Sequence, residues 1–155
     1  MLHYSFPIDA AIKALKFSRK LHYVPAFGEV LCAARSYLPH DIDAVLPVPL
    51  HWRREIFRGF NQAMEIAKPV SRMLDVPIVR GVQRIRATPF QSGLEAVERA
   101  RNLKGAFVAS RVNRHAHVLI IDDVVTTGAT TVQLGRSLLK SGVKKISVLA
   151  VARAN

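Results

Sequence analysis

Two adjacent carboxylates and a nearby hydroxyl-rich turn are the residues of this chain best suited to chemistry. Asp122 and Asp123 are followed, after two valines, by a turn whose candidate phosphate ligands are Thr126, Thr127, Gly128, Ala129 and Thr130. Such a turn can direct backbone N–H groups and hydroxyls at one phosphate, whereas carboxylates accept hydrogen bonds from sugar hydroxyls. A sugar phosphate satisfies both groups, with Asp122 and Asp123 on the ribose.

The surroundings of these residues favour a phosphate site over its simplest alternative. An ordinary strand followed by a polar turn and a helix N-cap contains the same residue types. Here, however, an unbroken aliphatic run at 118–121 precedes the carboxylates, which is typical of a buried parallel strand, and a helical pattern follows from residue 131. Ligands of open α/β sheets bind beyond the carboxyl ends of the strands, beside helix N-termini.

A second candidate region follows the apolar segment at 43–48. Its basic residues are His51, Arg53, Arg54 and Arg58. If this segment is a strand beside the carboxylate strand, these side chains face the same crevice and suit a pyrophosphate group, since arginine makes bidentate phosphate contacts. A solvated basic loop is an equally good interpretation. Trp52 alternates with the arginines, as do Phe57 and Phe60, which is also typical of a stacking platform for single-stranded nucleic acid, although Phe60 is expected in the core.

Residues 84–104 form a long basic excursion between predicted elements. Arg84 and Arg86 lie at its start, and a brief helix is expected at 95–102. A loop of this kind can close over a polyphosphate and exclude water, so we interpret it as a flexible lid. An ordinary exposed loop explains the composition equally well.

Apolar periodicity predicts the elements that position these residues. Helices are expected around residues 8–15, 27–38, 61–74 and 131–140, with a kink or early break at Pro69. Strands are expected at 43–48, 76–79, 105–109, 117–121 and 146–151. This alternation predicts an α/β fold in which helices flank a mostly parallel sheet, and one domain over 1–155 that starts with helices within 1–40.

Composition narrows the class of protein. The chain has 155 residues, half of them hydrophobic, and a formal net charge of +12, which favours a polyanionic partner. A single cysteine excludes an internal disulfide framework and a cysteine-based metal site. No apolar run approaches the roughly 20 residues of a membrane span, and no signal peptide is recognisable, so a cytoplasmic location is expected.

The segment 118–131 resembles the signature of the type I phosphoribosyltransferases, which bind 5-phosphoribosyl-1-pyrophosphate (PRPP). Other segments, together with the signature, are similar to the competence protein F (ComF) family within that superfamily. They are Val48-Pro49-Leu50-His51, residues 58–63, residues 84–91 and residues 99–107. The resemblance runs from about residue 6 to residue 153, essentially the whole chain.

This resemblance implies phosphate contacts at Thr126 to Thr130, ribose contacts at Asp122 and Asp123, and a basic pyrophosphate region around residues 51–58. It also implies Mg²⁺ bound through PRPP rather than by protein ligands, and a bacterial role in handling single-stranded DNA. Three functions remain open: phosphoribosyl transfer to a nitrogen acceptor, a non-catalytic single-stranded-DNA module, and a PRPP sensor for a competence helicase. Many family members begin with a four-cysteine zinc ribbon, which this sequence lacks, so we expect either a short member or a missing upstream piece.

Overall fold

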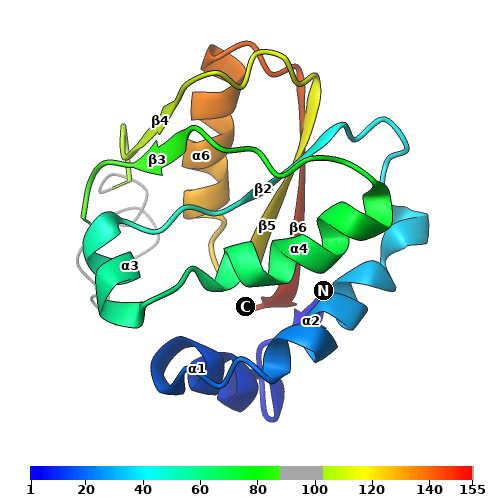
Figure 1. Ribbon diagram of the computed structural model, residues 1–155, viewed down its shortest axis with the longest axis vertical. Helices are drawn as coiled ribbons and strands as arrows, with labels where there is room; N and C mark the ends of the chain where they lie inside the picture. The colour runs from blue at the N-terminus through cyan, green and yellow to red at the C-terminus, as the bar shows by residue number, and fades with distance from the viewer. Residues whose placement is uncertain (88–102, 155) are drawn as a thin grey trace.

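The core of the protein is a four-stranded, wholly parallel sheet with the order β1-β6-β5-β2 (Figure 1). The computed structural model describes residues 1–87 and 103–154. The strands are β1 (Leu2–His3), β2 (Ala44–Pro47), β5 (His117–Val125) and β6 (Lys145–Arg153). The prediction of an α/β fold with a mostly parallel sheet is therefore confirmed.

The central strand β5 explains the unbroken apolar run in the sequence. Side chains along a strand alternate between the two faces of a sheet, and here both faces are covered. Leu119 and Ile121 belong to one hydrophobic core, Val118 and Ile120 belong to the other, and all four are fully buried.

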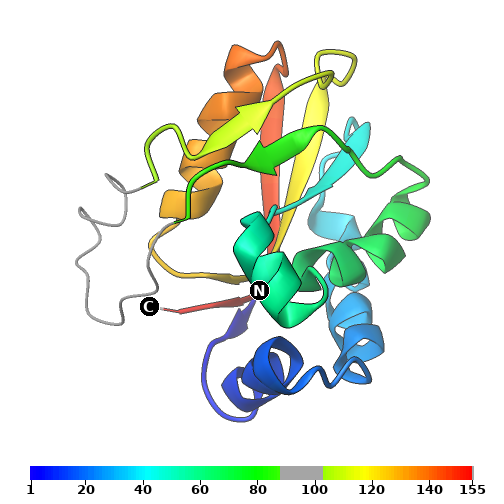
Figure 2. The same ribbon diagram turned by 60° about the vertical axis from the view of Figure 1, so that its left-hand side comes forward.

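Helices and a hairpin cover the two faces. One face carries α1 (Ile8–Ser18), α2 (Tyr23–Cys32) and most of α4 (Gln62–Leu74), and the other carries α6 (Ala129–Lys140). Beside α6 lies an antiparallel pair of strands, β3 (Val82–Arg84) and β4 (Phe107–Ala109) (Figure 2). Phe60 packs at the edge of the first core, as expected for it.

Two predicted helices differ from expectation. The second helix ends at Cys32 and is followed by a short 3₁₀ helix, Arg35–Tyr37, although Ala34 and Leu38 still pack against the core. The predicted break at Pro69 is wrong, because α4 continues through the proline to Leu74. The helix keeps its buried stripe on both sides of Pro69, and this packing offsets the lost backbone hydrogen bond.

Two short segments also differ from expectation. The strand expected at 76–79 is reduced to a single parallel bridge between Ile78 and Val45, since Pro77 has no N–H to donate. The edge strand expected at 105–109 is confirmed as β4, but its partner β3 was not predicted because its three residues are too short for a periodic pattern.

Most of the predicted lid lies outside the described residues. Of the segment 84–104, the structure describes only 84–87 and 103–104, so the brief helix expected at 95–102 stays a prediction. Within the described ranges, no helix combines the length and apolar character needed to cross a membrane.

The contact between α2 and α4 yields a stability prediction. A methyl group added at Gly28 would lie 2.7 Å from Cγ of Pro69, inside van der Waals contact with a rigid ring. We expect Gly28→Ala to lower the free energy of unfolding by about 1–3 kcal/mol in chemical denaturation. The control is Gly135→Ala in α6, whose added carbon meets only the end of the Ile146 side chain at 3.3 Å. That change should alter stability by less than about 1 kcal/mol, since alanine favours the helix. Equal stability of the two variants would contradict the close α2–α4 contact.

Candidate functional site

Asp122 and Asp123 lie within β5 rather than after it, because pairing with β6 continues through Val124 and Val125. Their side chains are held by the local backbone. Asp122 Oδ1 accepts a hydrogen bond from the Asp123 N–H at 2.9 Å, and Asp123 Oδ1 accepts one from the Val124 N–H at 2.8 Å. Pairing with β6 and these two hydrogen bonds therefore position both carboxylates before any ligand binds, which lowers the entropic cost of binding.

The two carboxylates differ in their electrostatic surroundings. Burial, and then the neighbouring charge of Asp123, raise the pKa of Asp122 well above its usual value. Asp123 instead has a counterion, since its Oδ2 lies 2.6 Å from Nζ of Lys16 in α1. The pair therefore combines one carboxyl group that resists ionisation with one that is ion-paired.

The turn from Thr126 to Thr130 connects β5 to α6 and exposes the first turn of that helix. The helix begins at Ala129, two residues earlier than predicted, after Gly128 with a φ of 75°. Within the described residues, the N–H groups of Gly128 and Thr130 donate no hydrogen bond, while Thr131 Oγ1 donates to the Gly128 carbonyl at 2.9 Å. Unpaired N–H groups at a helix N-terminus attract anions, so the turn has the features of a phosphate site.

The predicted basic loop is a short helix, α3 (Trp52–Arg58), which sequence analysis missed. His51 caps it, since its Nδ1 accepts a hydrogen bond from the Arg53 N–H at 3.3 Å. Burial, followed by nearby arginine charges, lowers the pKa of His51, so this imidazole is neutral at pH 7.

Two arginines interact with the carboxylates, and a third lies beside these arginines. Arg84 interacts electrostatically with Asp122, Arg58 interacts with Asp123, and Arg54 lies close enough to repel both arginines. Burial lowers the pKa of Arg54 and of Arg58, and it lowers the pKa of Arg84 to about 10. Partly desolvated guanidinium groups gain more from a bound anion than exposed ones do.

Two predicted pyrophosphate residues are directed elsewhere. The guanidinium of Arg53 lies 5.3 Å from the ring centre of Trp52, and Arg86 Nη1 donates to the Lys104 carbonyl at 3.2 Å. The structure therefore brings Arg58 and Arg84 to the carboxylates and Arg54 next to these two arginines, but gives Arg53 and Arg86 other contacts.

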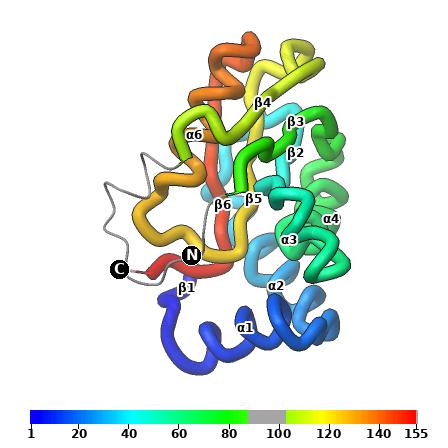
Figure 3. The backbone as a smooth tube through the Cα atoms, turned by 90° about the vertical axis from the view of Figure 1, so that its left-hand side faces the viewer, coloured from blue at the N-terminus to red at the C-terminus, as the bar shows by residue number. Residues whose placement is uncertain are grey.

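Lys16 is a site residue that sequence analysis did not identify. It lies on α1, which packs beyond the C-terminal ends of the central strands next to α3 (Figure 3). The helical pattern of α1 gave no sign of the contact, because the partner of Lys16 is more than 100 residues away in the sequence. The sequence also shows no recognisable segment that would cover the site and bind an acceptor base.

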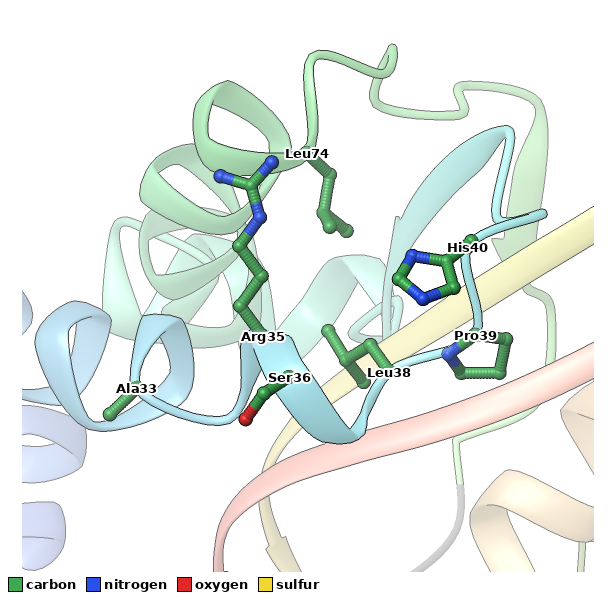
Figure 4. A pocket seen from close by; sticks show the side chains of 7 residues that line it. All are labelled: Ala33, Arg35, Ser36, Leu38, Pro39, His40 and Leu74. Carbon is green, nitrogen blue, oxygen red and sulfur yellow. The ribbon is translucent and has the colours of Figure 1, made fainter.

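A separate hollow of about 520 Å³ lies at the other end of the sheet, near the start of β2 (Figure 4). Its lining includes Arg35, Leu38, His40 and Leu74 and none of the predicted site residues. Among the described residues, no group of three or more His, Cys, Asp or Glu side chains is placed to hold a metal ion.

Sequence comparison gives relatives that cover nearly the whole chain. Competence protein F of Haemophilus influenzae is 35% identical over 98% of this chain and 70% of its own length. The DNA utilization protein YhgH of Escherichia coli K12 is 38% identical over 97% of this chain and 69% of its own length. No family model matches the chain.

Structural comparison gives the phosphoribosyltransferase fold. The glutamine PRPP amidotransferase from B. subtilis, complexed with ADP and GMP, superposes with a TM-score of 0.58 at 16% identity. The match covers 91% of this chain and 30% of the amidotransferase, so the present chain spans less than a third of that protein. The fold is that of the type I phosphoribosyltransferases.

The raised pKa of Asp122 predicts the pH dependence of stability. Because the folded state holds this proton more tightly than the unfolded chain, the contribution of Asp122 is fully favourable below pH 4 and is lost as pH rises through the folded pKa. Asp122→Asn keeps the acceptor for the Asp123 N–H but cannot ionise. The melting temperature of Asp122→Asn should exceed that of the wild type at pH 7–8, by about 3 °C for each kcal/mol gained in the free energy of unfolding. The difference between the two melting temperatures should disappear near pH 4. Glu29→Gln, which removes an exposed carboxylate from α2, is the control. A pH-independent gap between Asp122→Asn and wild type would contradict this prediction.

Proposed function

Because this chain belongs to the competence protein F family, we propose that it binds PRPP and transfers the phosphoribosyl group to a nitrogen acceptor, releasing pyrophosphate. One observation carries the proposal. Two half-buried arginines, with a third beside them, meet two carboxylates next to a helix N-terminus with unpaired N–H groups. PRPP has a group for each part: a 5′-phosphate, two ribose hydroxyls and a pyrophosphate.

The bound ligand is assigned part by part. The 5′-phosphate accepts hydrogen bonds from the turn at Thr126 to Thr130, and the ribose hydroxyls donate to Asp122 and Asp123. The pyrophosphate lies against Arg54, Arg58 and Arg84. Mg²⁺ enters on the phosphate oxygens of PRPP rather than on protein ligands. When bound there, Mg²⁺ supplies positive charge to the departing pyrophosphate.

The reaction follows from this arrangement. The bond between C1 and the pyrophosphate oxygen breaks, its electron pair leaves with pyrophosphate, and positive charge develops on the ribose ring. A nitrogen lone pair of the acceptor then forms the new bond to C1, and the proton of the acceptor nitrogen passes to an oxygen of the released pyrophosphate. The arginines stabilise the negative charge of the departing pyrophosphate. The carboxylates hold the ribose ring in position and stabilise the positive charge that develops on it.

The proposal is tested with PRPP and Mg²⁺. Ligand binding to the folded state should raise the melting temperature, and Arg84→Met should weaken PRPP binding at least about tenfold in calorimetry, since a buried charge-assisted contact is lost. Arg86→Met is the matched control, because Arg86 bonds to the Lys104 carbonyl instead. Absence of any PRPP binding by the wild type would reject the proposal.

Release of pyrophosphate in the presence of candidate nitrogen bases separates an enzyme from a sensor. PRPP binding without turnover would favour the alternative in which the same site reports PRPP levels to a partner such as a competence helicase. The fold and the carboxylates serve both functions, so only the turnover measurement distinguishes them.

The surface of α3 supports a second candidate function, binding of single-stranded DNA. Trp52, Ile56 and Phe57 are 58%, 73% and 80% exposed on a helix that also carries Arg53, Arg54 and Arg58. Exposed rings and cations on one short element suit a strand whose bases stack and whose phosphates pair with arginine. The names of the relatives, Competence protein F and DNA utilization protein, support a role in handling DNA.

This second function predicts separate effects for rings and charges. The double change Trp52→Ala and Phe57→Ala should weaken binding of an oligo-dT strand about tenfold or more in fluorescence anisotropy, with an unchanged salt slope. Arg53→Gln should instead reduce the slope of log affinity against log salt by about 1. Tyr37→Ala, which removes a ring that is 88% exposed outside α3, is the control. If oligo-dT fails to bind at low salt, the DNA candidate is wrong.

A further inference from the structure

The Lys16–Asp123 ion pair lies inside the proposed ribose site. Nζ of Lys16 is 2.6 Å from Oδ2 of Asp123, and only 22% of the lysine and 10% of the aspartate side chain is exposed. The fully buried side chains of Ile12 and Leu15 anchor α1 in the core, so the lysine is presented from a packed helix rather than from a free tail.

The last turn of α1 makes further contacts with the same region. The ring of Phe17 lies 5.4 Å from the guanidinium of Arg58, and the guanidinium of Arg19 lies against Gly59, the residue after α3. The end of α1 is therefore built into the wall of the site together with α3.

Both oxygens of Asp123 have a partner that fixes the carboxylate. Oδ1 accepts a hydrogen bond from the Val124 N–H at 2.8 Å, and Oδ2, which is buried from solvent, lies 2.6 Å from Nζ of Lys16. Oδ1 keeps a second lone pair, so a ribose hydroxyl can donate to it while Lys16 holds Oδ2. The lysine therefore fixes the orientation in which Asp123 meets a ligand.

The charges explain why a cation is needed at this point. A phosphorylated sugar brings several negative charges next to two carboxylates, and like charges in a partly buried site repel strongly. The pKa of Asp122 is raised, so this group resists ionisation, whereas Lys16 neutralises Asp123. Removing the lysine would take away the ion-pair partner of Asp123 and leave only the charge of Arg58 to offset this carboxylate beside a polyanion.

From these contacts we infer that Lys16, carried by α1, is a positioning residue of the site. It holds Asp123 in the orientation that accepts a ribose hydroxyl, and it neutralises the charge that Asp123 presents to the phosphates of the ligand. This inference rests on the proposed function, because it deepens the description of the same site.

The experiment compares three probes on the purified full chain: inorganic phosphate, ribose 5-phosphate and PRPP with Mg²⁺. Inorganic phosphate occupies only the turn at Thr126 to Thr130, whereas the other two bring a ribose to Asp123. Lys16→Met should weaken ribose 5-phosphate and PRPP about tenfold or more in calorimetry and leave inorganic phosphate within about twofold. Lys16→Arg, which keeps the charge, should recover most of the lost affinity. The control is Lys13→Met on the same helix, since Lys13 pairs with Asp9 at 2.8 Å.

A second measurement does not depend on a folded variant. Hydrogen exchange of the wild-type chain should slow in residues 8–18 when ribose 5-phosphate binds, and should not change with inorganic phosphate.

The outcomes separate the inference from the proposed function. If the wild type binds none of the three probes, the proposed function itself fails. If the wild type binds ribose 5-phosphate but Lys16→Met binds it equally well, or exchange in residues 8–18 is unchanged, the role of Lys16 is rejected. An equal loss of all three probes would show a general structural effect and would also overturn the inference.

Discussion

The burial of β5 between two hydrophobic cores determines where the carboxylates and the turn into α6 lie. Four consecutive aliphatic side chains are fully buried, two on each face, so the strand can neither rotate nor slip without exposing one set. The carboxylates that follow are consequently held by the ladder to β6, and the turn into α6 starts from a rigid end. Precise placement of polar groups thus derives from apolar packing that makes no contact with a ligand.

Electrostatics in the site follow from this placement. Carboxylates and arginines are concentrated at one end of the sheet, where each group loses part of its hydration and is held by its neighbours instead. The opposite pKa directions of Asp122 and Arg84, raised for the acid and lowered for the base, both have burial as their largest cause. Arg58 and Arg84 lie near these two acids, and burying the charged groups together costs hydration free energy that their mutual attraction repays only in part.

Elements with strong local patterns were predictable, and elements defined by long-range contacts were not. The periodicity of α4 and α6 and the aliphatic run of β5 identify these elements because each buries a regular stripe of its own. By contrast, α3 has no buried residues, β1 has two residues and β3 has three, so none carries a periodic signal. Pro69 suggested a break from local chemistry alone, but the packing of α4 against the core overrides that preference.

The parallel sheet, the placement of Asp122 and Asp123 toward the C-terminal end of its strands, and the turn at Thr126 to Thr130 can all be inferred from the amino-acid order, because each is specified by neighbours within a few residues. Which cations reach the carboxylates depends on long-range packing and cannot be inferred in this way. Arg53 and Arg86 are as basic as Arg58 and Arg84, yet helix geometry and the β3–β4 hairpin direct the first two away. Lys16 reaches Asp123 only because burial of Ile12 and Leu15 docks α1 at the end of the sheet, and no local pattern encodes a contact across that distance.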